Sequence, residues 1–188
     1  MTVLKEGKTM AKTFKMTIAG CERELPLCEV NEHLDIAAFI MFGDVEITEK
    51  ATAELLKVSP EHDIVITAEA KGIPLCYEMA RQGCGKYIIA RKGVKVYMPD
   101  PISVNVQSIT TLSQQTLYLG SDDAELMKGK RVLIVDDVIS TGESLRALEA
   151  LVNKAGGVIV GKAAVLAEGD AADRDDIIFL EKLPVFPK

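Results

Sequence analysis

Two adjacent carboxylates and a run of small hydroxylated residues lie close together in the second half of the chain. Asp136 and Asp137 follow the apolar, β-branched run 130–135, which is typical of a buried strand. The loop that comes next is rich in hydroxyl groups, and its members are Ser140, Thr141, Gly142, Glu143 and Ser144. Apolar residues beyond this loop recur with helical spacing, so the loop would begin a helix.

The loop 140–144 has the chemistry of a phosphate site. The first turn of a helix offers unpaired N–H groups and the positive end of the helix dipole, where a phosphate monoester can accept hydrogen bonds. Gly142 would let the backbone come close to the phosphate. Asp136 and Asp137 can accept hydrogen bonds from two neighbouring sugar hydroxyls. We therefore expect residues 132–144 to form a strand, a loop and a helix start that hold a phosphorylated ribose.

A plainer interpretation of the same segment exists. Asp136 and Asp137 could be a solvated strand end, and residues 140–142 could be an ordinary helix N-cap. A bare Asp-Asp or Ser-Thr-Gly would favour that interpretation. The complete string of strand, two acids, hydroxylated loop and helix favours the ribose phosphate site.

Two further polar segments follow apolar runs of strand type. They consist of Glu69, Ala70, Lys71 and Gly72 in one loop and of Arg91 and Lys92 in the next. Taken singly, the first would be a turn and the second a solvated basic pair. Since the carboxyl ends of parallel strands meet at one edge of a sheet, both should lie beside the loop 140–144. Their cations would then suit a second anionic group such as pyrophosphate.

The elements that must position these loops alternate between strand and helix. Apolar runs predict strands at 63–67, 87–90, 117–119, 130–135 and 158–166, and helical spacing predicts helices at 35–42, 48–58, 74–82 and 143–155. Thr48 is the expected N-cap of its helix. Near-continuous apolar runs are typical of strands buried on both faces. The predicted fold class is α/β, with a mainly parallel sheet flanked by helices.

The beginning of the chain has a different pattern. Residues 1–13 are polar and are expected to form a frayed arm. Phe14, Met16 and Ile18 then alternate with polar residues before Gly20, which predicts a β-hairpin. We expect residues 1–34 to be a small hood or dimer element, and residues 35–188 to be the core domain.

Together, the three loops resemble those of the type I phosphoribosyltransferases, and their order matches the adenine and xanthine branch. The string 132–144 is similar to the phosphoribosyl pyrophosphate signature of that family. Residues 69–72 resemble the Glu-Ala/Ser-Arg-Gly loop of the adenine enzymes, with Lys71 in place of arginine, which keeps a cation but loses the bidentate fork. Residues 90–93 resemble the basic strand end before the mobile lid, which would be 93–115 here. The resemblance covers about residues 35–168.

The resemblance implies a reaction and a set of roles. A purine nitrogen would displace pyrophosphate from C1 of phosphoribosyl pyrophosphate, as in nucleotide salvage. The catalytic residues would be Asp136, Asp137 and Arg91, with the two acids on the ribose 2- and 3-hydroxyls. Residues 140–144 would hold the 5-phosphate, and residues 69–72 with Arg91 and Lys92 would hold the pyrophosphate. Mg2+ would bind mainly through substrate oxygens, without a protein metal site, and the protein would be a homodimer.

The expected base is adenine or another base with an amino group. Xanthine enzymes have a lysine after the strand that corresponds to 158–166, whereas this chain has Glu168. A carboxylate accepts from an amino group and cannot donate to a carbonyl. A solvated strand end is the plainer interpretation of Glu168. Two alternatives remain for the protein: a regulatory protein that binds phosphoribosyl pyrophosphate, or a transferase for another base such as xanthine.

Composition and charge argue against several other classes. Lys and Arg number 22 against 28 Asp and Glu, and the net charge of -6 argues against a nucleic-acid partner. No apolar run approaches the roughly 18 residues of a membrane span, and the first residues lack the apolar centre of a signal peptide. We therefore expect no membrane partner and a cytoplasmic location. The four cysteines form no Cys-x-x-Cys pair and there are two histidines, so a zinc site is not expected.

Overall fold

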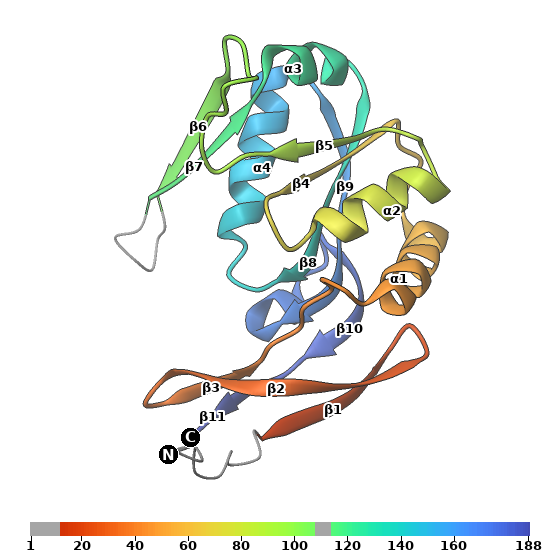
Figure 1. Ribbon diagram of the computed structural model, residues 1–188, viewed down its shortest axis with the longest axis vertical. Helices are drawn as coiled ribbons and strands as arrows, with labels where there is room; N and C mark the ends of the chain where they lie inside the picture. Colours follow the sequence, from red (N-terminus) through yellow and green to blue (C-terminus); the bar gives the residue numbers. More distant parts are fainter. Residues whose placement is uncertain (1–11, 108–113) are drawn as a thin grey trace, which may run out of the picture.

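A computed structural model of the chain describes residues 12–107 and 114–188 (Figure 1). Its centre is a sheet of five strands in the order β10-β9-β8-β4-β5, in which every neighbouring pair is parallel. The strands are β4 (Ile64–Ala68), β5 (Tyr87–Ala90), β8 (Arg131–Ile139), β9 (Val158–Glu168) and β10 (Ile178–Leu183). Every residue of β4 is buried, as expected for an inner strand that is covered on both faces. The predicted α/β fold with a parallel sheet is confirmed.

Helices cover both faces of this sheet. They are α1 (Val45–Val58), α2 (Ile73–Gln82), α3 (Ser121–Met127) and α4 (Glu143–Ala155). Ile64 and Ile66 of β4 belong to the hydrophobic cluster that contains α4, whereas Val65 belongs to the cluster that contains α1 and α2. Successive residues of a strand point to opposite faces, so the sheet is the middle of three layers. Within the described residues, no helix has both the length and the apolar character that crossing a membrane requires.

The N-cap of α1 differs from the prediction. Asp44 is the cap, and its Oδ1 accepts a hydrogen bond from the backbone N of Ile47 at 3.2 Å. Thr48 lies inside the first turn, where its hydroxyl donates to the carbonyl of Asp44 at 2.7 Å. The prediction of Thr48 was wrong because Asp and Thr both cap helices well and helical spacing alone does not choose between them. Asp44 also pairs with Arg23 at 2.6 Å, a contact between distant parts of the chain.

Residues 35–42 do not form the predicted helix. Leu34–Ala37 is strand β3, and no helix follows before α1. Ala37, Phe39 and Met41 are 2, 4 and 1% exposed, so every second side chain points inward. That is the pattern of a half-buried strand, and the prediction was wrong because a short apolar run was assigned to the wrong period.

A second sheet of four strands, in the order β1-β2-β3-β11, lies at the bottom of Figure 1 beyond the arrowhead of β10. β1 (Thr13–Ile18) and β2 (Cys21–Asn31) form the predicted hairpin. β3 pairs with β2 on one side and with β11 (Val185–Pro187) on the other. The sheet thus takes strands from both sides of residue 34, where the predicted boundary lies. The predicted arm, apart from residues 12 and 13, lies outside the described residues.

The predicted lid, residues 93–115, contributes to an antiparallel hairpin. β6 (Ile102–Gln107) pairs with β7 (Gln114–Leu119), which includes the strand predicted at 117–119. Figure 1 shows this hairpin beside α4, and the apolar side chains of β6 pack on the cluster to which α4 belongs. Residues 108–113 lie outside the described part of the chain.

Candidate active site

The three polar segments that the sequence singled out meet at one edge of the central sheet. Lys71 Nζ lies 3.0 Å from Asp137 Oδ2, which joins the loop after β4 to β8. Arg91 Nε lies 3.2 Å from Glu69 Oε2, and the backbone N of Lys92 donates to Glu69 Oε1 at 2.7 Å, which joins the ends of β4 and β5. The carboxyl end of a parallel sheet is where such folds bind ligands.

Asp136 and Asp137 lie inside β8, not beyond its end as the sequence suggested. β8 continues to Ile139 because its pairing with β9 continues, with Asp136 in register with Ala164. Asp137 is only 2% exposed. Its backbone N donates a hydrogen bond to Oδ1 of Asp136 at 2.9 Å. Burial, and then the neighbouring Asp137, raise the pKa of the Asp136 carboxyl above its usual range. The pair therefore resists carrying two negative charges at once.

The loop 140–144 surrounds a hollow of about 50 Å³, to which Asp136 also contributes. Gly142 has a φ of 75° and occupies the N-cap position of α4. This left-handed conformation suits glycine, and a glycine at the cap has no side chain that could cover the first N–H groups of the helix. The arrangement can receive a small anion at the helix start.

Gly72 allows the loop after β4 to approach β8. A Cβ at this position would collide with Thr67 Oγ1 and come within 2.9 Å of Asp136 Oδ1. Its φ of -73° is open to any residue, so space alone requires glycine here. This contact keeps the loop 69–72 against the acid pair.

A larger hollow, of about 350 Å³, opens between the two sheets. Lys71, Ser140 and Glu168 contribute polar groups to it, whereas Phe39 and Val138 contribute apolar walls. Partial burial raises the pKa of the Glu168 carboxyl, and the charge of Lys71 acts in the opposite direction. The hollow can hold a flat, mostly apolar group with one polar edge.

Some residues around this hollow were missed at the level of sequence. Phe39 was assigned to a helix, and Val138 was treated only as a spacer between the acids and the loop. No local signal marked Phe39, because residues 37–41 are all apolar and their alternate burial is visible only in the structure. Nothing local marked Leu183, because it reaches the hollow only through the tertiary packing of β10.

Arg91 also connects the site to the hairpin β6-β7. Its backbone N donates to the carbonyl of Tyr118 at 2.9 Å, and the backbone N of Tyr118 donates back to the carbonyl of Arg91 at 2.8 Å. The side chain of the same arginine faces Glu69. A movement of the hairpin would therefore act directly on the loop 69–72.

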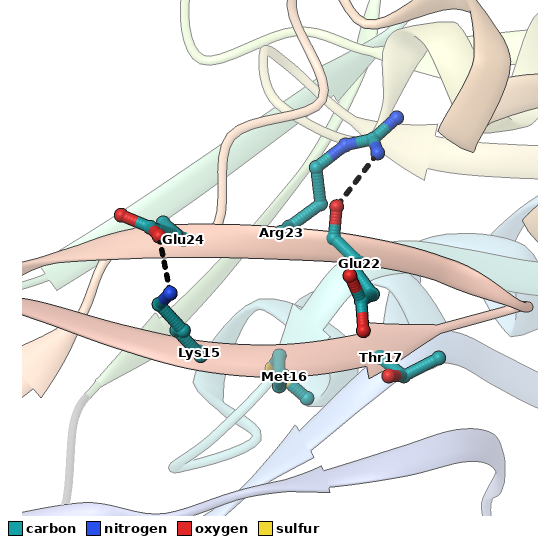
Figure 2. A pocket seen from close by; sticks show the side chains of 6 residues that line it. All are labelled: Lys15, Met16, Thr17, Glu22, Arg23 and Glu24. Carbon is teal, nitrogen blue, oxygen red and sulfur yellow. Dashed lines mark hydrogen bonds and ion pairs between the residues drawn. The ribbon is translucent and has the colours of Figure 1, made fainter.

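A separate hollow of about 430 Å³ lies over the hairpin β1-β2, away from the strand ends (Figure 2). Its cations already have partners: Lys15 pairs with Glu24 at 2.9 Å (Figure 2). Arg23 pairs with Asp44. Figure 2 shows the guanidinium of Arg23 next to the backbone oxygen of Glu22, to which it donates at 2.9 Å. Because it contains no helix start and lies away from the carboxyl ends of the parallel strands, we place the candidate site at those strand ends instead.

No group of three or more His, Cys, Asp or Glu side chains within residues 12–107 and 114–188 has the arrangement of a metal site. Asp136 lines the small hollow together with the loop 140–144, and Asp137 is its neighbour in β8. A Mg2+ ion that is bound mostly by substrate oxygens needs only one or two protein carboxylates. The donor set of this site is thus compatible with a metal that arrives with its substrate.

Comparison with known proteins gives consistent matches. The family model described as "Phosphoribosyl transferase domain" matches residues 44–185. The chain is 32% identical over 134 residues to a hypoxanthine/guanine phosphoribosyltransferase of Methanococcus voltae, which covers 71% of this chain and 68% of that protein. It is 30% identical over 128 residues to an adenine phosphoribosyltransferase of Brachyspira hyodysenteriae, which covers 68% of this chain and 70% of that protein.

A solved structure has a similar fold. The adenine phosphoribosyltransferase of Thermoanaerobacter pseudethanolicus superimposes with a TM-score of 0.64 at 23% identity, over 76% of this chain and 84% of that chain. At this level of identity the likeness concerns the arrangement of the backbone.

Proposed function

The chain belongs to the phosphoribosyltransferase family, among the purine enzymes, and on that premise we propose that it transfers the 5-phosphoribosyl group of phosphoribosyl pyrophosphate to an aminopurine, adenine in the first place. The observation that carries this proposal is the convergence of the loop 69–72, the acid pair and the loop 140–144 at one sheet edge. Each of the three parts has the chemistry for a different part of the substrate.

The sugar would bind across β8 and the start of α4. The amides and hydroxyls of residues 140–144 would hold the 5-phosphate, and the acids Asp136 and Asp137 would accept hydrogen bonds from the 2- and 3-hydroxyls. The support for this is the burial of Asp137 and the small hollow that the loop encloses next to Asp136. Both ends of the ribose would then be fixed by rigid elements, which orients C1 for attack.

The pyrophosphate would lie between the loops after β4 and β5. Lys71, Arg91 and Lys92 are the cations of these loops. Glu69 connects the loops, because its carboxylate contacts the guanidinium of Arg91 and accepts from the backbone N of Lys92. As the bond from C1 to pyrophosphate breaks, positive charge grows on the sugar and negative charge on the leaving group. Cations that are already in place stabilise that leaving group. Mg2+, bound mainly through substrate oxygens, would add positive charge at the same point.

The base would occupy the hollow between the two sheets. Its apolar walls suit a purine ring, and the Glu168 carboxylate suits an amino group or a ring N–H at the polar edge. Adenine offers such an amino group, and guanine offers both an amino group and an N–H. Guanine is the second candidate, because relatives at about one-third identity are named hypoxanthine/guanine phosphoribosyltransferases.

We also propose a homodimer in which a second copy covers an apolar surface on α1 and α2. Phe42, Val45 and Tyr77 are 52, 68 and 50% exposed there, and they border a hollow of about 250 Å³. An exposed apolar patch of this kind is typical of an interface, and self-association is its commonest use in symmetric oligomers. Since α2 directly follows the loop 69–72, the contact would lie beside the pyrophosphate.

A panel assay tests the proposed function. The purified chain is incubated with phosphoribosyl pyrophosphate and adenine, guanine, hypoxanthine, xanthine or uracil, with and without Mg2+, and pyrophosphate release is measured. We expect Mg2+-dependent turnover with adenine. We expect turnover with guanine as well if Glu168 accepts hydrogen bonds from both the amino group and the ring N–H of that base. Binding of phosphoribosyl pyrophosphate without turnover of any base would contradict the proposed transfer and would favour a regulatory role.

A further inference from the structure

Arg174 lies against the loop 140–144, although it is far from that loop in sequence. A Cβ built on Gly142 would come within 2.8 Å of Nη1 of Arg174. In the described part of the chain, no other heavy atom beyond the neighbours of Gly142 lies within 4 Å of that position. The missing side chain of Gly142 therefore makes room for a guanidinium as well as permitting the left-handed backbone.

A chain of ion pairs holds Arg174 in this position. Its Nε and Nη2 donate to the two carboxylate oxygens of Asp176 at 2.8 and 2.7 Å. Asp176 also pairs with Lys162, whose Nζ lies 2.8 Å from Glu149 Oε1 on α4. The bidentate contact between Arg174 and Asp176 uses two guanidinium nitrogens and leaves the third, Nη1, next to the loop 140–144. The guanidinium is thus fixed to α4 through side chains that the loop itself does not contain.

Two opposing electrostatic effects act on the charge of Arg174 while the loop is empty. Gly142 is the N-cap of α4, and the N-terminal end of a helix carries a partial positive charge that repels a guanidinium. Asp176 opposes this repulsion, because its hydrogen bonds, and then the charge of Glu149, raise the pKa of the Arg174 guanidinium. A bound phosphate would turn the helix end and Arg174 into two attractive partners of one anion.

We propose that Arg174 is a positioning residue of the 5-phosphate subsite, an inference that rests on the proposed function. Its guanidinium packs on the open side of Gly142 and keeps the loop in the conformation in which the amides face the phosphate. Its charge adds to the attraction of a sugar phosphate monoester. Asp176 accepts two hydrogen bonds from the guanidinium of Arg174 and so fixes its orientation.

Two probes separate this role from a general effect on structure. Ribose 5-phosphate would bind at the loop 140–144, whereas inorganic pyrophosphate with Mg2+ would bind at the loop 69–72. For Arg174→Gln we expect the affinity for ribose 5-phosphate, measured by calorimetry, to fall about tenfold, and the affinity for pyrophosphate to stay within about twofold. Arg174→Lys should recover part of the lost affinity, because it keeps the charge without the fork.

Lys182→Gln is the matched control. Lys182 belongs to the exposed ion pair with Asp173 at 3.1 Å, on the strand that follows Arg174, and its removal should alter neither affinity. If Arg174→Gln does not fold, Asp176→Asn takes its place. That change frees the guanidinium and should give the same selective loss in smaller measure.

Two outcomes would overturn the assignment: an unchanged affinity of Arg174→Gln for ribose 5-phosphate, or an equal loss for both probes. Failure of the proposed function would look different, because the unaltered protein would then bind neither probe, and both proposals would fall. Normal turnover by the unaltered protein, together with unchanged ribose 5-phosphate binding by Arg174→Gln, would remove only the role of Arg174.

Discussion

Nζ of Lys71 lies 3.0 Å from Oδ2 of Asp137, so the loop after β4 supplies the cation that faces the more buried of the two acids. The lysine side chain is 54% exposed and the aspartate side chain 2%, so only the lysine has room to move. A sugar hydroxyl that binds to Asp137 must share this carboxylate with Lys71 or displace it. The proposed sugar and pyrophosphate subsites are therefore coupled through one ion pair.

Lys71→Met should destabilise the protein and weaken pyrophosphate binding. The substitution leaves the Asp137 carboxylate buried without its facing cation, which should lower the free energy of unfolding by about 1 kcal/mol once the exposure of Lys71 is considered. Urea unfolding measures this change. Lys71→Arg keeps the cation and should lose less. Adding Asp137→Asn should restore stability to Lys71→Met, and simple additivity of the two changes would contradict the coupling.

The stability of the protein should carry a pH-dependent contribution from Asp136. Burial and Asp137 raise the pKa of this carboxyl in the folded chain, so the folded state binds the proton more tightly than the unfolded state does. The free energy of unfolding should therefore decrease as the pH rises from the pKa of the carboxyl in the unfolded chain, about 4, to its raised pKa in the folded chain. Asp136→Asn removes this loss.

Urea unfolding at pH values between about 4 and 8 tests this sign. The free energy of unfolding of Asp136→Asn, minus that of the unaltered protein, should increase with pH across this range. Asp170→Asn, at an exposed position, should show no such trend. A difference for Asp136→Asn that stays flat or decreases would contradict the raised pKa.

Gly72→Ala should lower both stability and activity. The added methyl group would collide with Thr67 Oγ1 and press on Asp136 Oδ1, so the loop 69–72 must move away from β8. Overpacking of this kind costs about 1–3 kcal/mol. Gly93→Ala is the control, because its Cβ would meet nothing within 4 Å in the described residues. Equal melting temperatures for the two variants would contradict the close approach of Gly72.

Glu168→Gln should change the preference among bases. The amide is a weaker acceptor than the carboxylate and also donates, so kcat/KM for adenine or guanine should fall about tenfold while that for hypoxanthine falls less. Steady-state kinetics with each base gives the ratios. Glu181→Gln, at an exposed position on β10, should leave them unchanged. An equal fall for all bases would indicate that Glu168 does not contact the base.

Phe42→Lys should convert the proposed homodimer into monomers. A charge placed in the middle of an apolar contact cannot be buried without a large desolvation cost. Sedimentation velocity of the two proteins at equal concentration measures the shift. Val158→Lys, a substitution of a side chain that is 54% exposed at the start of β9 and does not line the hollow beside Phe42, is the control. A monomeric unaltered protein would exclude this interface.

Four of the five parallel strands, β4, β5, β8 and β9, could be predicted from the sequence because each has its own apolar run, whereas β10 has a polar second half and was not predicted. Val65 packs on one face of the sheet and Ile66 on the other, so both must be apolar. A strand that is buried on both faces can therefore be recognised from its own residues. The meeting of Lys71 with Asp137 could be predicted in outline for a related reason: parallel strands bring their following loops to a common edge.

The remaining features depend on contacts between distant segments. β3 exists as a strand because β2 and β11 lie on its two sides, and the run around Ile36 contains no sign of either partner. The end of β8 depends likewise on pairing with β9, so Asp136 could not be assigned to the strand from its own neighbourhood. Arg174 was not singled out, since its approach to Gly142 follows from the packing of the short 3-10 helix Gly169–Asp173 before it.

The place of β11 has a consequence for biosynthesis. β3 leaves the ribosome early, yet one of its two partners, Val185–Pro187, is made roughly 150 residues later. At synthesis rates of about 5–20 residues per second, the segment around Ile36 waits for about 8–30 seconds with one edge unpaired. The four-stranded sheet that borders the hollow of about 350 Å³ is therefore completed only after the loops 69–72 and 140–144 have been made.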